Sequence, residues 1–393
     1  MSDRPIRLAF TLIPRELWAG GYNYQRNLFA TLYNYRRGEI TPVVFAGMAA
    51  DASDLSGLSE IRDVEVTQSN AFDRRGAGLA AALTLGLDGA AAKAFRDQGI
   101  DVVFESARFF GWRLPYPAVA WFPDFQHRRL PQLFPPLARW RREIGFRAQI
   151  ASGRTIMLSS ESAQRDCQKF YATPPDRMSV VRFATQPAPA LLAAEPGDVI
   201  KQYGLPRRYF YLPNQFWRHK NHQVVIDALT ILAKRGVDVA VVASGGKDDA
   251  REPDYFAGIK RQLGERNLQE KFRYVGMIPL PHVYALLRAA TALINPSRFE
   301  GWSTTVEEAK SFGVPMVLSD IDVHREQAAG TARYFGTDDP VALADHLAAS
   351  MQNAEPVTTR NLVADLDARV LRFADDFVDT IRAALARNQP AKS

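Results

Sequence analysis

Short apolar runs alternate with helical patterns along this chain, and the alternation occurs twice. In the first half, the runs lie at 6–13, 42–46, 102–105, 119–122 and 155–159. Parallel strands need a crossover between them, and a helix usually provides it. The first half therefore predicts an α/β domain with a doubly wound parallel sheet.

A segment rich in proline and alanine, 186–197 (QPAPALLAAEPG), separates the two halves and is expected to be a linker. The second alternation has apolar runs at 209–212, 237–243, 272–275, 292–296 and 315–319. A chain of 393 residues, 47% of them hydrophobic, is long enough for two cores. We expect one Rossmann-like domain over 1–190, a second over 191–370, and a closing amphipathic helix with a tail over 371–393 that crosses back over both.

The net charge of +6 is concentrated in one segment. Residues 128–154 contain seven arginines and one acid, Glu143, and the rest of the chain is balanced. A protein that binds phosphate backbone along its length spreads its basic residues over a surface. We therefore expect no nucleic-acid partner, although a basic nucleic-acid-binding protein stays as the alternative from another functional class.

The basic segment also carries apolar residues at helical spacing. Leu137, Trp140 and Ile144 fall on one helical face, with arginines around them. This composition suits an anionic membrane surface, which makes 128–154 a candidate docking patch. The alternative, weighted equally, is a helix whose arginines pair with acids elsewhere in the fold.

Cysteine content and hydropathy bear on location. The one cysteine, Cys167, cannot form an internal disulfide, and the N-terminal stretch lacks the long apolar core of a secretory signal. No run approaches the ~20 apolar residues that span a bilayer. We expect a cytoplasmic protein, at most peripheral on the inner face of the cytoplasmic membrane.

The strongest chemical signal is the segment 295–327, NPSRFEGWSTTVEEAKSFGVPMVLSDIDVHREQ. Glu300 follows a predicted strand, and Glu308 lies in the next predicted helix with seven residues between them. The segment resembles the glutamate pair of retaining glycosyltransferase family 4, in its bacterial polysaccharide and lipopolysaccharide branch. The resemblance covers most of the second half, but in the first half only the glycine pair at 20–21, the loop 124–130 and the segment 159–171.

The resemblance implies a GT-B fold, in which two Rossmann-like domains face a cleft. It also implies transfer of a sugar from a nucleoside-diphosphate-sugar donor to a glycan or lipid-linked acceptor. Another GT-B enzyme, a sugar-nucleotide epimerase or a phosphorylase, is the nearest alternative.

The resemblance assigns roles in the glutamate segment. Glu300 contacts the hydroxyls of the donor sugar and Glu308 the ribose. Backbone N–H groups of the residues opening the helix bind the diphosphate, which suits a helix N-terminus; these residues are Gly301, Trp302, Ser303 and Thr304. The alternative for Glu308 is a capping box, with Thr305 as N-cap, or Thr304 paired with Glu307. Glu300 precedes the cap and has no such alternative.

The loop PNQFWRHKNH, 213–222, follows the first strand of the second half. In the resembling family this loop supplies an arginine and, five residues later, a lysine that neutralise the leaving diphosphate. Lys220 matches the lysine, but Gln215 stands at the arginine position, so Arg218 is the expected substitute. Fixed positive charge at a leaving oxygen lowers the barrier to transfer. The alternative is a solvated basic loop.

The first half contributes His127, which follows the strand at 119–122 together with Asp124. The resemblance places His127 beside the donor sugar in a positioning role, and an ordinary surface histidine is the alternative. Gly20 and Gly21 are expected to form a tight turn where backbone approaches phosphate, and Gly245 a similar loop in the second half. A plain turn is the alternative for these glycines.

Metal dependence is not expected. Two Asp-x-Asp triplets, 320–322 and 365–367, occur late in the chain, but a three-residue pattern of a common amino acid arises by chance. We therefore predict that the protein uses no metal and no cofactor beyond the donor substrate.

Overall fold

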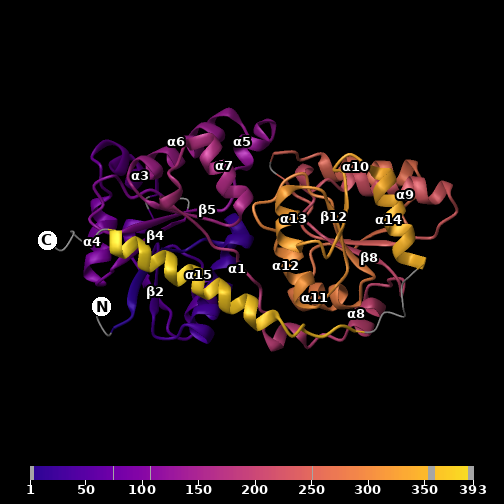
Figure 1. The fold of residues 1–393 in the computed structure, drawn as a ribbon, viewed down its shortest axis with the longest axis horizontal. Coiled ribbons are helices and arrows are strands. Elements are labelled where there is room, and N and C mark those ends of the chain that lie inside the picture. The colour runs from indigo at the N-terminus through magenta and orange to yellow at the C-terminus, as the bar shows by residue number, and fades with distance from the viewer. Residues whose placement is uncertain (1–3, 74, 107, 250, 353–358, 388–393) are drawn as a thin grey trace. The chain divides into compact units, whose positions relative to one another are not determined.

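The computed structural model describes residues 4–73, 75–106, 108–249, 251–352 and 359–387 (Figure 1). The chain divides into two compact units. The first unit contains the residues up to Ala184 together with those from Asp367 onward, and the second contains Thr185–Leu366. Part of the tail expected over 371–393, residues 388–393, lies outside the described residues.

The first unit is built on a parallel sheet of seven strands in the order β3–β2–β1–β4–β5–β6–β7. The strands are β1 (Ile6–Thr11), β2 (Ile40–Ala46), β3 (Glu65–Gln68), β4 (Val102–Ser106), β5 (Ala118–Phe122), β6 (Thr155–Leu158) and β7 (Met178–Val180). The five apolar runs of the sequence all became strands. The edge strands β3 and β7 were not predicted, because they are short and partly exposed and so lack an apolar run.

The helices of the first unit are α1 (Arg15–Tyr35), α2 (Ala52–Ser59), α3 (Arg75–Thr84), α4 (Gly89–Asp97), α5 (Gln126–Arg129), α6 (Pro136–Ala151), α7 (Glu161–Tyr171) and the C-terminal α15 (Leu366–Arg387). Short 3₁₀ turns lie at Asn70–Phe72, Pro131–Leu133 and Pro175–Arg177.

The predicted glycine turn at Gly20 and Gly21 is wrong, because both residues lie inside α1. The helix begins at Arg15 and is interrupted at Trp18, whose backbone is non-helical. A Cβ atom on Gly21 would lie 2.3 Å from a ring carbon of Trp18. The glycines are therefore needed to make room for an indole rather than to turn the chain.

The second unit has a parallel sheet of six strands in the order β10–β9–β8–β11–β12–β13. The strands are β8 (Phe210–Pro213), β9 (Val241–Ser244), β10 (Phe272–Tyr274), β11 (Ala292–Asn295), β12 (Met316–Ser319) and β13 (Arg333–Phe335). The helices are α8 (Pro196–Gln202), α9 (His222–Lys234), α10 (Tyr255–Glu265), α11 (Leu280–Ala289), α12 (Thr304–Ser311), α13 (Asp322–Ala328) and α14 (Pro340–Gln352). The expected linker 186–197 contains a 3₁₀ turn, Pro189–Leu192, and the first residues of α8.

Both sheets are doubly wound, which confirms the predicted fold class. Strand order reverses between β1 and β4 in the first sheet and between β8 and β11 in the second. In such sheets the loops at the carboxyl ends of the two central strands diverge, and ligands bind in the crevice that they leave. The loops after β8 and β11 are therefore the first place to look for a site in the second unit.

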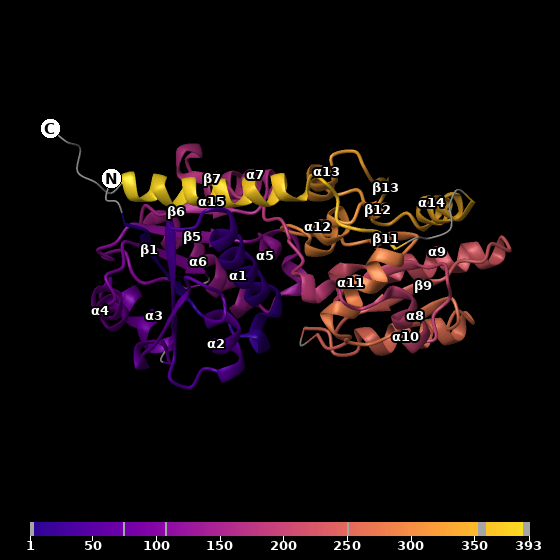
Figure 2. The ribbon, with the colours of Figure 1, turned by 90° about the horizontal axis from the view of Figure 1, so that it is seen from below.

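Helix α15 returns to the first unit and runs along it in both views (Figures 1 and 2). The ring of Phe377 packs against Phe10 and Phe104, with ring centroids 6.4 and 5.8 Å away. The helix begins at Leu366, five residues before the segment expected from its amphipathic pattern. The C-terminal segment is thus part of the core of the first unit.

Candidate active site

The loops that leave β8 and β11 are tied together at the point where strand order reverses in the second sheet. Three hydrogen bonds join them: Asn214 Nδ2 to Asn295 Oδ1 (3.3 Å), Asn221 Nδ2 to the carbonyl of Pro296 (3.1 Å), and the N–H of Arg298 to the carbonyl of His219 (2.8 Å). Residues 75 to 81 positions apart in sequence are thereby held side by side.

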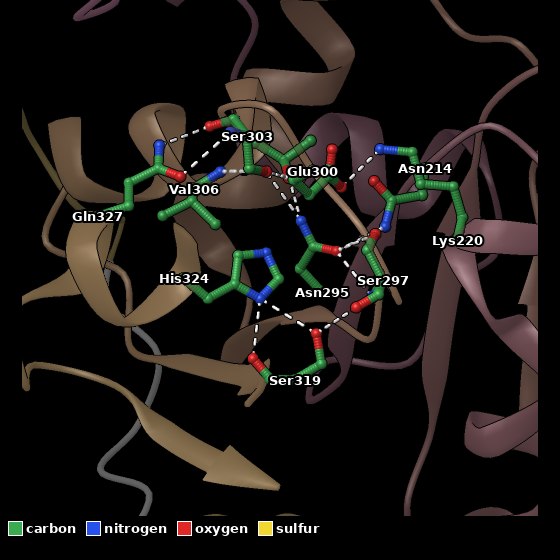
Figure 3. A network of polar contacts seen from close by, with 11 residues as sticks. Asn214, Lys220, Asn295, Ser297, Glu300, Ser303, Val306, Ser319, His324 and Gln327 are labelled. Carbon is green, nitrogen blue, oxygen red and sulfur yellow. Dashed lines mark hydrogen bonds and ion pairs between the residues drawn. The ribbon is translucent and has the colours of Figure 1, made fainter. Parts of the chain in front are cut away.

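Lys220 and Glu300 form an ion pair across these two loops (Figure 3). Lys220 Nζ lies 2.6 Å from Glu300 Oε1, and the side chains are only 15% and 9% exposed. Burial by itself would raise the pKa of Glu300, but the Lys220 ammonium outweighs it and holds the pKa below its ordinary value. Two residues chosen separately from the sequence therefore make one charged pair.

The loop that carries Glu300 is fixed at both ends by side-chain amides. Asn295 Oδ1 accepts from the hydroxyl of Ser297 (2.7 Å), and Asn295 Nδ2 donates to the hydroxyl of Ser303 (2.8 Å). Gln327 accepts from the N–H of Ser303 (3.1 Å) and donates to its carbonyl (2.7 Å). Glu300 is thus presented by a rigid loop, which limits how far its carboxylate can move.

His324 supports the same loop from below, one turn before Gln327 on α13 (Figure 3). Its Nδ1 lies 3.0 Å from the carbonyl of Ser319, whose hydroxyl donates to the carbonyl of Ser297 (2.5 Å). A carbonyl only accepts, so Nδ1 carries the proton. Nε2 is buried without a hydrogen-bond partner among the described residues, and burial lowers the pKa of the ring. His324 is therefore a neutral imidazole.

The start of α12 differs from both expectations for it. Ser303 is the N-cap, and its hydroxyl accepts from the N–H of Val306 (3.4 Å), so neither capping box with Thr304 or Thr305 forms. The N–H of Ser303, expected to bind diphosphate, is already used by Gln327. Thr304 is exposed at the first position of the helix. Of the four residues predicted to contact phosphate, Ser303 therefore uses its N–H and its hydroxyl in hydrogen bonds within the protein.

Glu308 lies within α12 and has a different environment from Glu300. Its carboxyl is buried and hydrogen-bonded with the phenol of Tyr284. Burial raises the pKa of Glu308 to about 8. The carboxyl is therefore mostly protonated at neutral pH, when it can both donate and accept a hydrogen bond.

In the loop 213–222, Arg218, the cation expected to replace the missing arginine, is paired with another residue. The guanidinium of Arg218 donates to Glu252 (2.7 Å), and its side chain is 61% exposed. Gln215, which replaces the expected arginine, accepts from the N–H of Gly246 (2.7 Å). Gln215 therefore joins the loops after β8 and β9, and Lys220 is the cation that meets Glu300.

Gly245 has a structural requirement of its own. Its φ is +141°, and a Cβ atom there would lie 2.4 Å from the carbonyl oxygen of Asn214. Its N–H donates to the carbonyl of Gly276 (3.0 Å). The close approach of two loops thus accounts for this glycine.

His127 lies on α5 in the first unit, with no exposed surface. The hydroxyl of Tyr171 donates to Glu143 (2.8 Å), so it accepts from His127 Nε2 (3.0 Å), and the proton of the ring is on Nε2. Nδ1 is buried without a hydrogen-bond partner in the described part of the chain. Burial, followed by the nearby Arg142, lowers the pKa of His127 to about 4. The alternative of a surface histidine is wrong, and the neutral ring reaches a ligand only if its surroundings move.

Residues 200–361, which contain all of this geometry in the second unit, match the family model for glycosyl transferases group 1. The chain is 26% identical over 277 residues to O-antigen chain mannosyltransferase B of Escherichia coli, an alignment that spans 67% of this chain and 69% of the relative. The chain is a glycosyltransferase that is similar to the glycosyl transferases group 1. The resemblance and the sugar-transfer activity expected from the sequence are confirmed.

Solved structures show that the glycosyltransferase has the GT-B fold. A glycosyltransferase from Rickettsia africae superposes with a TM-score of 0.65 at 14% identity, over 99% of this chain and 97% of that one. Anabaena Alr3699/HepE in complex with UDP and glucose gives a TM-score of 0.65 at 15% identity, over 97% and 98% of the two chains. At these identities the likeness concerns the fold alone.

The first acidic triplet of the glycosyltransferase is engaged within the protein at Asp320. Asp320 is held by Arg325, with both carboxylate oxygens 2.7 Å from guanidinium nitrogens. Within the described ranges, no group of three or more histidine, cysteine or acidic side chains is placed to hold a metal ion. Metal independence of the reaction stays a prediction.

The basic segment 128–154 is largely paired. Five of its arginines contact acids: Arg128 and Arg147 with Glu143, Arg129 with Asp166, Arg142 with Asp124, and Arg154 with Glu105. Leu137 and Trp140 on α6 remain 57% and 61% exposed, next to the exposed Arg139 and Arg141. Among described residues, no helix has the length and apolar character needed to cross a bilayer.

Sequence reasoning missed the residues that hold the Glu300 loop: Asn214, Asn295, Ser297, Ser319, His324 and Gln327. Their one visible signal is the spacing of His324 and Gln327, which puts both on one face of a short helix directly after a predicted strand. The hydrogen bonds themselves depend on which strands are neighbours, and this is not visible in the spacing.

Proposed function

We propose that the enzyme transfers a sugar, with retention of anomeric configuration, from a nucleoside-diphosphate-sugar bound by its second unit to a glycan or lipid-linked acceptor of bacterial surface polysaccharide assembly. The Lys220–Glu300 pair carries this proposal, because it puts a cation and a carboxylate together at the strand-order reversal of an open α/β sheet. The E. coli relative, named an O-antigen mannosyltransferase, supports the polysaccharide setting.

Lys220 supplies positive charge for the leaving diphosphate. Loss of a nucleoside diphosphate builds negative charge on the departing oxygen, and a fixed cation stabilises it at the transition state. Glu300 accepts hydrogen bonds from the hydroxyls of the donor sugar. Each of these buried charges is balanced by the other, so neither is left unpaired. Binding of the donor then replaces the ion pair with contacts from Lys220 to the diphosphate and from Glu300 to the sugar hydroxyls.

Glu308 is proposed to bind the ribose of the donor. A protonated carboxyl presents one donor and one acceptor, which matches a pair of adjacent hydroxyls. The N-terminus of α12 adds its dipole to the diphosphate site, through the residues other than Ser303.

The donor class is tested by thermal shift in the presence of UDP, GDP, ADP, CMP or dTDP. The proposal predicts that at least one nucleotide stabilises the wild-type protein and that Lys220→Ala removes most of the stabilisation. Arg218→Ala, which removes a cation of the same loop that is paired elsewhere, is the matched control and keeps the shift. No stabilisation of the wild type by any of the five would contradict the proposal.

The enzyme is further proposed to work at the cytoplasmic face of a membrane, where lipid-linked acceptors are available. The exposed Leu137 and Trp140, flanked by Arg139 and Arg141, support docking through α6. Co-sedimentation with vesicles containing anionic lipid is expected for the wild type and reduced for Trp140→Ala. Trp112→Ala, which removes another half-exposed tryptophan of the first unit, is the control. Equal sedimentation of wild type and Trp140→Ala would refute docking through this helix.

A further inference from the structure

The positive charge of Lys220 is balanced within the protein by Glu300, whose carboxylate lies 2.6 Å away (Figure 3). A nucleoside diphosphate carries more than one negative charge, so this pair alone leaves the charge of such a ligand largely uncompensated. Cations bind phosphate oxygens through charge-assisted hydrogen bonds. The loops that surround the pair are therefore the place to look for a further cation.

Six loops leave the carboxyl ends of the strands of the second sheet, and their described residues include five lysines and arginines. Four of the five are paired with acids: Arg218 with Glu252, Lys220 with Glu300, Arg251 with Asp249, and Arg298 with Asp338. The fifth, Lys247, is exposed and makes no ion pair or side-chain hydrogen bond with any residue that the structure describes. Lys247 is therefore the cation of these described loops that no acid pairs.

The residue before Lys247 is tied to the loop 213–222, which also carries the first cation. The carbonyl of Gly246 accepts from the N–H of Phe216 (2.8 Å), and the N–H of Gly246 donates to Gln215 Oε1 (2.7 Å). Two hydrogen bonds in opposite directions thus fix this glycine against the loop. Because consecutive Cα atoms are about 3.8 Å apart, Lys247 begins directly beside position 215.

The residue after Lys247 is tied to the same loop. The carbonyl of Asp248 accepts from Nε1 of Trp217, 3.4 Å away, and the guanidinium of Arg251 lies over the same indole at 5.3 Å. An exposed lysine is most often only solvated. Lys247 differs because the backbone on both of its sides is held, while its flexible stem lets the ammonium reach an anion.

The side chain at position 215 gives this lysine a purpose. Gln215 stands where the sequence comparison expected an arginine, and its neutral amide is used to hold Gly246. The positive charge that is absent from position 215 is thus present on the residue that follows Gly246. The two loops together carry two cations, one from each.

We propose that Lys247 binds the diphosphate of the donor and takes the place of the arginine that is absent at position 215. The inference rests on the proposed function, because it takes the ligand to be a nucleoside-diphosphate-sugar. It adds a residue on the loop after β9 and a chemical role for it. Lys247 contacts a phosphate oxygen, and Lys220 binds the same diphosphate from the loop after β8.

The test is isothermal titration calorimetry with UDP, GDP, ADP and dTDP. The nucleoside diphosphate that binds the wild type should bind Lys247→Ala about tenfold more weakly at low salt, the loss expected for one hydrogen bond between charged groups. Lys247→Arg keeps the positive charge and should bind nearly as well as the wild type. Lys234→Ala, the matched control, removes an exposed lysine in the last turn of α9, before β9 begins, and should match the wild type.

Salt separates a charge contact from a structural role of the lysine. The difference in affinity between wild type and Lys247→Ala should shrink as sodium chloride is raised, because salt screens an exposed cation. Equal affinities of wild type and Lys247→Ala, or a loss that is the same at every salt concentration, would overturn the inference.

Lys220→Ala distinguishes this result from a failure of the proposed function. Loss of binding in Lys220→Ala with unchanged binding in Lys247→Ala would refute the inference alone and leave the proposed function standing. No binding of any of the four nucleoside diphosphates to the wild type would contradict both.

Discussion

Replacement of Lys220 by methionine tests whether the Lys220–Glu300 pair is a buried ion pair whose partners depend on each other. The two charged atoms are 2.6 Å apart, and the side chains are 15% and 9% exposed. Lys220→Met leaves the Glu300 carboxylate buried without its main partner, so burial then raises its pKa with much less opposition. Removing one member of a buried pair costs about 3 kcal/mol of folding free energy. Urea denaturation of the ligand-free protein measures this loss.

The chain provides a matched control in Arg218→Met. Arg218 and Glu252 approach to 2.7 Å, but their side chains are 61% and 30% exposed. An exposed pair contributes about 0–1 kcal/mol, so this variant should lose little. In the Lys220→Met background, Glu300→Gln should recover most of the lost stability, because it removes the unpaired charge. A loss for Lys220→Met no larger than that for Arg218→Met, or no recovery in the double variant, would refute the reasoning.

Three further predictions concern pH, loop support and metal. Burial in the folded protein raises the pKa of Glu308 from 4.5 to about 8. The protonated carboxyl therefore contributes to the free energy of unfolding, and this contribution is complete below the unfolded pKa and is lost as the pH rises to 8. The free energy of unfolding, measured by urea denaturation, should fall by about 1.5 kcal/mol from pH 6.5 to 8, and Glu308→Gln should abolish that fall. The same fall in Glu308→Gln would exclude this carboxyl as its source. His324→Ala should lower kcat and raise the KM for donor, while His282→Ala, at a histidine hydrogen-bonded to Tyr203, should not. Equal kinetics of the two variants would show that the loop needs no support from α13. A chelator should leave the transfer rate unchanged, and inhibition reversed by added magnesium or manganese would disprove metal independence.

The sequence was sufficient for the elements that have long apolar runs. The central strands of both sheets were found because parallel strands buried on both faces are continuous apolar segments. Strands β3, β7 and β13 lie at sheet edges with only three or four residues, and their exposed positions interrupt the pattern. These three edge strands therefore left no distinct signal.

The glycine pair in α1 shows how a sound local rule can fail. Glycine pairs usually mark turns, and Gly20–Gly21 follows the first strand, where a turn was expected. The structure uses them to seat Trp18, two and three residues earlier in the sequence. This depends on the packing of an indole against Trp121, about 100 positions along the chain, which local spacing does not show.

The candidate site was found in part for the same reason. Lys220 and Glu300 were each visible from their motifs, but their contact follows from the adjacency of β8 and β11. Arg218 was a reasonable substitute cation until the structure placed Glu252 beside it. The residues that hold the Glu300 loop act through hydrogen bonds among three loops, and so only the fold brings them together.

The central claim is that Lys220 and Glu300 together serve sugar transfer, and the rate of nucleoside diphosphate release tests it most directly. The assay compares wild type, Lys220→Ala, Glu300→Ala and Arg218→Ala with donor below saturation, each checked for folding. The account predicts a loss of about 100-fold or more for the first two variants, and near wild-type rates for Arg218→Ala. Near-normal release by folded Lys220→Ala or Glu300→Ala would contradict it.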